Sequence, residues 1–122
     1  MMRIRHKFWL EENSEVLFGR GRYMLLRTVD ELGSLSAAAK KMKMSYRAAW
    51  GRVRASEERL GLPLMEKAPV GRGLVLTDQA RKLIEMYRRF EDEIDALVRE
   101  KGSRIFGAES GLDLVIDDEP VD

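Results

Sequence analysis

The sequence predicts a mainly α-helical fold with one small β-hairpin and a long C-terminal helix. Three observations predict it. Two amphipathic stretches of helical period are separated only by Lys43 and Met44. Two brief apolar runs flank the segment KAPVGRG, whose proline and glycines suit a hairpin loop. From Ala80 to Leu97, apolar residues recur at alternating spacings of three and four, which is a heptad pattern.

The N-terminal region is expected to hold one strand and one helix. Residues 3–10 alternate between apolar and mostly charged side chains, which is the period of a half-buried strand. The polar segment EENSE follows as a turn. Apolar residues at positions i, i+1, i+4 and i+7 then predict a helix over residues 23–32, which Gly33 ends.

Two further helices follow, joined by a short turn. Either Ser34 or Ser36 can cap the first, which is about two turns long. Ser45 can cap the second, expected over residues 45–60, with Gly61 as its stop. Small alanines stand where the two helices must approach closely, so this pair predicts a helix-turn-helix.

A hairpin and the long helix complete the predicted order. The apolar runs at 64–66 and 74–76 are the expected strands, with Arg72 at the tip of the loop between them. Thr77 is the expected N-cap of the long helix, which continues to about residue 101. A strand, three helices, a hairpin and a long helix, in this order, are the elements of a winged helix-turn-helix.

The net charge of +1 conceals two halves of opposite sign. Residues 1–76 hold 15 Lys and Arg against 8 Asp and Glu, whereas residues 77–122 hold 7 against 13. This asymmetry predicts a surface that binds a polyanion, followed by an acidic tail over residues 102–122. We expect the tail to be mobile, with one short strand at 112–116. The alternative is a solvated basic face without a partner.

Composition excludes several classes of protein. A chain of 122 residues is expected to form one domain, or one domain plus an arm. No apolar run reaches the roughly 20 residues that span a bilayer, so a cytoplasmic location is expected. The sequence has no cysteine, and its one histidine, His6, cannot build a metal cluster. No catalytic pairing of nucleophile and base stands out, so we expect neither an enzyme nor a cofactor.

The helix at 45–60 has two distinct faces. On a helical wheel, Ala49, Val53, Ser56 and Leu60 form the face toward the core. The opposite face carries Arg47, Gly51, Arg54 and Ala55. A guanidinium can donate two hydrogen bonds to guanine or clamp a phosphate, so these arginines suit the major groove of DNA. Gly51 permits close approach of the backbone, although simple tolerance of glycine explains it equally well.

The aromatic residues of this helix have two alternatives each. Tyr46 can contact a phosphate or a thymine methyl group, or it can simply pack. Trp50 is nearer the core and is expected to position the helix by packing, with contact to nucleic acid as its alternative role. In the hairpin, Lys67 and Arg72 can neutralise phosphate or enter the minor groove. The predicted DNA-binding residues are Ser36, Ser45, Tyr46, Arg47, Gly51, Arg52, Arg54, Lys67 and Arg72.

The heptads of the long helix permit two interpretations, which are packing on the chain's own core and a two-fold dimer seam. Its length favours the dimer, because about 23 residues at about 1.5 Å each exceed what a small three-helix domain covers. The predicted domains are therefore a winged helix-turn-helix at 1–76, a dimerisation helix at 77–101 and the tail. The predicted dimer-interface residues are Ala80, Leu83, Tyr87, Phe90, Ile94 and Leu97.

The segment GSLSAAAKKMKMSYRAAWGRVRASEERLGLPLMEK resembles the helix-turn-helix of LysR-type and ModE-type, molybdate-dependent transcriptional regulators. The SYRAAW element, GRGLVLT and ARKLIEMYRRFE are most similar to ModE, and the resemblance covers approximately residues 18–98. It implies a bacterial or archaeal homodimer that binds double-stranded DNA, with contacts from Ser45, Tyr46, Arg47 and the wing. ModE-type regulators normally continue into a molybdate-binding region that these residues do not include, so whether molybdate binds stays an open question.

Two further questions stay open at this stage. Ser56 stands where the family pattern favours a larger apolar residue, so either a helical carbonyl satisfies its hydroxyl or the packing is looser. The leading function is sequence-specific DNA binding by a homodimer. The alternative is an adaptor that binds another protein through the winged helix and heptad helix, with the acidic tail as a nucleic-acid mimic.

Overall fold

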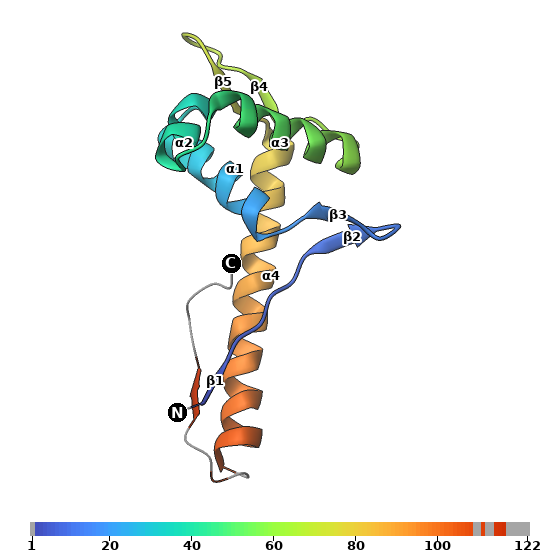
Figure 1. The fold of residues 1–122 in the computed structure, drawn as a ribbon, viewed down its shortest axis with the longest axis vertical. Helices are drawn as coiled ribbons and strands as arrows, with labels where there is room; N and C mark the ends of the chain where they lie inside the picture. The colour runs from blue at the N-terminus through green and yellow to red at the C-terminus, as the bar shows by residue number, and fades with distance from the viewer. Residues whose placement is uncertain (1, 109–110, 112–113, 117–122) are drawn as a thin grey trace. The chain divides into compact units, whose positions relative to one another are not determined.

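The computed structural model describes residues 2–108, 111 and 114–116. Their contacts divide the chain into two compact units, which are Trp9–Glu85 and the pair of segments Met1–Phe8 and Met86–Asp122. The elements are shown in Figure 1. No helix among the described residues combines the length and the apolar character needed to cross a membrane.

The unit Trp9–Glu85 has the predicted mainly α-helical architecture and the predicted hairpin, and it contains a second hairpin that was not predicted. Its helices are α1 (Arg20–Leu32), α2 (Leu35–Lys41), α3 (Tyr46–Leu60) and the start of α4 (Asp78–Gly102). Its strands are β2 (Leu10–Glu12), β3 (Glu15–Phe18), β4 (Met65–Lys67) and β5 (Leu74–Leu76). Strands β4 and β5 pair antiparallel and form the predicted wing.

Local capping chemistry sets the ends of these helices. Of the two candidate caps, Ser34 is the one that caps α2, because its Oγ accepts a hydrogen bond from the Ala37 amide at 3.1 Å. Helix α1 ends at Gly33 and α3 ends at Gly61, whose φ angles of 86° and 71° lie in the left-handed region. Glycine adopts this region without the cost that a Cβ imposes, so both stops occur where predicted.

The core of this unit lies where α1, α2 and α3 pack together with the base of the wing. Apolar side chains from these three helices, from β3 and from both strands of the wing fill it. Small residues of α2 and α3 let the two helices approach closely, as the sequence predicted. The fully buried residues of this core include Phe18, Leu25, Leu26, Val29, Leu35, Ala38, Ala49, Val53, Leu64 and Leu76.

The strand predicted at residues 3–10 is wrong over most of its length. Only β1 (Met2–Ile4) and the first residue of β2 fall in strands, and β2 folds back on β3 through the turn at Asn13 and Ser14. Both turn residues have positive φ, 52° and 65°, which suits a tight hairpin turn. The turn therefore draws β2 into a hairpin of its own, and residues 5–9 have no strand partner.

The second unit explains the alternation of residues 3–10 in another way. The Phe8 ring stacks on Tyr87 of α4 with 4.8 Å between centroids, and it meets Phe90 edge-on at 5.1 Å. His6 Nε2 lies 2.7 Å from Asp95 Oδ1. Alternate side chains of the N-terminal segment thus pack on a helix, and this packing produces the same period of two as a half-buried strand.

The second unit also contains the short strand expected near the C-terminus. Strand β6 (Leu114–Ile116) pairs in parallel with β1, and a π-helical segment, η1 (Ser103–Ala108), follows α4. The mobility predicted for the acidic tail concerns, in large part, residues 109–110, 112–113 and 117–122, which lie outside the described residues.

Candidate nucleic-acid interface

Helix α3 presents the two faces that its sequence predicts. Ser45 Oγ accepts a hydrogen bond from the Ala48 amide at 3.0 Å and begins the helix. Ala49 and Val53 are fully buried, and Ser56 is 3% exposed. Because these residues hold α3 against the domain, the opposite side of the helix must face solvent.

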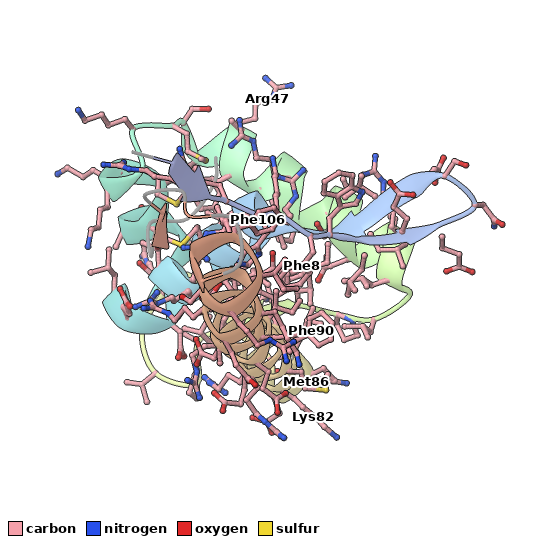
Figure 2. All side chains as sticks on the ribbon, turned by 90° about the horizontal axis from the view of Figure 1, so that it is seen from below. Phe8, Arg47, Lys82, Met86, Phe90 and Phe106 are labelled. Atoms are coloured by element: carbon pink, nitrogen blue, oxygen red, sulfur yellow. The ribbon has the colours of Figure 1, made fainter. Side chains whose placement is uncertain are left out.

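Arginine and glycine occupy that outer face. Arg47, Gly51 and Arg54 are all exposed, and Figure 2 shows Arg47 projecting away from the ribbon. The Arg54 guanidinium lies over the Trp50 ring at 5.6 Å and is 3.7 Å from Glu57 Oε1, so it is partly held in place. Arg47 makes no ion pair with any described residue and is available to an anion.

The wing stands beside one flank of α3. A groove of about 530 Å³ is lined by Tyr46 and Trp50 from the helix and by Lys67 and Arg72 from the wing. Tyr46 is 45% exposed, whereas Trp50 is half-buried, as expected for a residue that positions the helix. The groove therefore combines two aromatic rings with two exposed cations.

Arg72 stands at the tip of the wing between two glycines. Gly71 and Gly73 have φ angles of 81° and 100°, a conformation that side chains with a Cβ rarely adopt. These glycines let the loop turn tightly, and Arg72 is exposed to solvent. An arginine in this position can reach phosphate or a narrow groove.

Glu57 ties the wing to α3, a role that the sequence did not reveal. Its Oε2 accepts hydrogen bonds from the amides of Leu64 and Met65, at 2.7 and 3.3 Å. Thr77 closes the other side, since its hydroxyl donates to the Pro63 carbonyl at 2.8 Å and accepts from the Ala80 amide at 3.1 Å. The available signal was a pair of carboxylates, Glu57 and Glu58, shortly before a Gly-x-Pro turn.

Two predicted DNA-binding residues belong neither to the groove nor to the outer face and N-terminus of α3. Ser36 is exposed on α2 and does not cap it. Arg52 lies on the flank of α3 opposite Trp50, where its Nη1 is 3.9 Å from Met44 Sδ. The structure therefore brings Tyr46, Lys67 and Arg72 together and leaves Ser36 and Arg52 elsewhere on the surface of the domain.

The partner of Ser56 comes from another helix. Arg22 Nε, on α1, donates a hydrogen bond to Ser56 Oγ at 3.0 Å. Burial lowers the pKa of the Arg22 guanidinium, and the nearby charges of Arg52 and Arg59 lower this pKa further. The open question about Ser56 is thus answered by a contact between α1 and α3, which no local pattern contained.

The predicted dimer residues of α4 differ in exposure. Phe90 and Leu97 are 53% and 52% exposed, whereas Ala80 and Tyr87 are buried by the chain itself. Met86, which the heptad count passed over, is 50% exposed and shares a helical stripe with Phe90. Figure 2 shows Met86, Phe90 and Phe8 along this side of α4.

Comparison with known proteins places this fold in a family. Residues 22–81 match the model described as "Bacterial regulatory helix-turn-helix protein, lysR family". The chain is 37% identical over 90 residues to the molybdenum-pterin-binding protein MopB of Rhodobacter capsulatus, covering 71% of this chain and 33% of that protein. It is 34% identical over 73 residues to the transcriptional regulator ModE of Haemophilus influenzae, covering 57% and 29%.

A solved structure agrees with these matches. The crystal structure of the CbnR_DBD–DNA complex superposes with a TM-score of 0.52 at 28% identity, covering 72% of this chain and 94% of that chain. The chain spans about a third of the length of the curated relatives that it matches. Residues 22–81 are therefore a winged bacterial regulatory helix-turn-helix domain of the lysR family, and over its N-terminal part the chain is a relative of the ModE-type regulators.

Proposed function

We propose that this protein is a transcriptional regulator that binds specific sequences of double-stranded DNA. The observation that carries the proposal is the exposed Arg47–Gly51–Arg54 face of α3, with the cationic wing beside it. A matching fold in the solved CbnR_DBD–DNA complex supports DNA as the partner. The basic N-terminal half of the chain, 15 Lys and Arg against 8 Asp and Glu, supplies the sequence-independent attraction.

Each part of the surface has its own chemistry. Residues 45–60 enter the major groove, where Arg47 and Arg54 donate to guanine or phosphate. Tyr46, in the first turn of α3, contacts a phosphate or a thymine methyl group. Residues 67–73 lie on the backbone or in the minor groove, with Lys67 and Arg72 as the cations. The Ser36 and Ser45 hydroxyls donate to phosphate at the helix N-termini.

The proposal includes a homodimer formed through α4. Met86, Phe90 and Leu97 form an exposed apolar stripe that a second copy of the helix would cover. The division of labour is then DNA binding by residues 1–76 and dimerisation by residues 77–101, followed by the tail at 102–122. A two-fold dimer presents two copies of α3 to successive major grooves, so the preferred site is roughly palindromic.

Fluorescence anisotropy with labelled promoter fragments tests the proposal. The wild-type chain should prefer some fragments over a scrambled duplex at each salt concentration. Arg47→Ala should weaken binding to the preferred fragment by about 1–3 kcal/mol and reduce the preference. Arg27→Ala is the matched control, since Arg27 is also exposed but pairs with Glu31 at 3.0 Å on α1. Equal affinity for all duplexes contradicts sequence-specific regulation.

A further inference from the structure

Three arginines gather on the side of α3 that lies opposite the wing. Arg52 and Arg59 are seven residues apart, so they project from one flank of the helix, and Ser56 stands between them near the core side. Arg22 reaches this place from α1 and donates its Nε–H to Ser56 Oγ at 3.0 Å. Tyr46 and Trp50, which line the wing groove, occupy the other flank.

The arginines of this cluster form no direct ion pair within the part of the chain that the structure describes. Among the described residues, no carboxylate lies within ion-pair distance of Arg22, Arg52 or Arg59. Other arginines of the same unit do have such partners, for example Arg27 with Glu31 at 3.0 Å and Arg81 with Asp78 at 3.1 Å. The cluster is therefore a concentration of like charge that an external anion would offset.

Hydrogen-bond donors also remain available. The guanidinium of Arg22 has five N–H groups, and within the described part of the chain only Nε has an acceptor. Arg59 Nη1 donates to the Val16 carbonyl at 2.9 Å, which fixes the group without cancelling its charge. Among the described residues, the hydrogen-bond acceptor of Arg52 is the weakly accepting sulfur of Met44, 3.9 Å from Nη1.

Short side chains leave room in front of this cluster. Ala48 and Ala55 occupy α3 between the exposed arginine face and the flank of Arg52 and Arg59. A methyl group there lets a bulky anion come close to the helix. Glu12, Glu15 and Glu58 line a hollow together with Arg59, so these carboxylates disfavour an anion at Arg59 more than at Arg22 and Arg52.

We propose that Arg22, Arg52 and Arg59 form a second phosphate-binding surface, which holds the DNA strand on the side of α3 away from the wing. This inference rests on the proposed function. Two phosphate strands border a major groove of about 12 Å. With the outer face of α3 in that groove, the wing meets one strand and the arginine cluster meets the other. The Arg22–Ser56 hydrogen bond positions the half-buried guanidinium between Arg52 and Arg59.

The salt dependence of DNA binding tests this surface. We would measure the observed binding constant of the full chain from about 50 to 200 mM salt for wild type and for Arg22→Gln, Arg52→Gln and Arg59→Gln. Each lost phosphate contact should reduce the slope of log K against log salt by about 0.9. The loss of affinity should be the same on preferred and scrambled duplexes, because phosphate contacts carry no sequence information.

Two matched variants separate charge from structure. Arg27→Gln removes one guanidinium from α1 outside the cluster, so its slope should equal that of wild type. Ser56→Ala keeps all three charges but removes the hydrogen-bond acceptor of Arg22. Its slope of log K against log salt should equal that of wild type, and its DNA affinity should fall less than that of Arg22→Gln. Arg52 is exposed, so Arg52→Gln remains informative if Arg22→Gln does not fold by circular dichroism.

Three results would overturn the inference. The first result is that Arg52→Gln and Arg59→Gln have the same slope of log K against log salt as Arg27→Gln. A second is a loss confined to preferred duplexes, which would indicate base contacts. A third is unchanged DNA slopes together with arginine Nε–H shifts on titration with inorganic phosphate, which would assign the cluster to a free anion. Equal binding of all duplexes by the wild-type chain would refute the proposed function. The difference in salt slope between wild type and the arginine variants would still test this surface.

Discussion

Replacing Glu57 by alanine should detach the wing from α3 and destabilise the domain. The carboxylate is 13% exposed and accepts the amides of Leu64 at 2.7 Å and Met65 at 3.3 Å. Both amides belong to buried residues, and no other acceptor replaces Glu57 at this point of the described chain. Glu57→Ala therefore leaves two donors unsatisfied in a site that water reaches poorly.

The size of the effect follows from these two bonds. A hydrogen bond to a charged group contributes about 1.5–3 kcal/mol, and the longer of the two should contribute near the lower limit or less. We therefore expect the free energy of unfolding to fall by about 3 kcal/mol, with a decrease in Tm of about 10 °C for a chain of this size. Glu57→Gln keeps one side-chain oxygen and should lose only about 1 kcal/mol.

Urea unfolding followed by circular dichroism measures this loss, and amide hydrogen exchange localises it. The amides of Leu64 and Met65 should lose protection in Glu57→Ala more than those in the centre of α1. Glu58→Ala is the control, since Glu58 is exposed and should change stability by less than about 0.5 kcal/mol. If Glu57→Ala were no less stable than Glu58→Ala, the assigned anchoring of the wing would be wrong.

Three other substitutions test separate parts of the molecule. Gly51→Ala should stabilise α3 by up to about 1 kcal/mol, because alanine favours the helix and nothing lies within 4 Å of the added Cβ. The same substitution should weaken DNA binding, and unchanged affinity would mean that the backbone does not approach DNA. Leu97→Arg should shift the chain from dimer to monomer in sedimentation equilibrium, and an unchanged mass would exclude this stripe as the interface. Phe8→Ala should remove the contacts with Tyr87 and Phe90, lower the free energy of unfolding by about 2 kcal/mol and speed hydrogen exchange in the N-terminal segment. An exchange rate equal to that of wild type would show that other contacts hold the segment.

Local chemistry made much of the fold predictable from sequence. Ser45 caps α3, while Gly33 and Gly61 end helices in the left-handed conformation, and each effect depends on a few neighbouring residues. The two faces of α3 were predictable for the same reason, since helical period alone separates the buried Val53 from the exposed Arg47. The wing likewise followed from its turn residues and short apolar runs.

A periodic pattern of apolar residues indicates which side chains are buried but not which element buries them. This is why the strand predicted at residues 3–10 was wrong. An extended segment that buries every second side chain has the same alternating sequence pattern whether those side chains pack in a sheet or on a helix. The N-terminal segment alternates because Phe8 packs on Tyr87 and His6 contacts Asp95, both far along the chain. The hairpin of β2 and β3 depends on a two-residue turn of positive φ at positions that glycine does not occupy.

The sequence by itself determined the helices, their caps, the outward arginine face of α3 and the division of charge between the two halves. Tertiary structure alone decided which distant groups meet. Arg22 donates to Ser56 beside Arg52, and the Phe8 ring stacks on Tyr87. Such pairs depend on the packing of whole elements against one another, because a side chain many residues away leaves no local pattern at the position that it contacts.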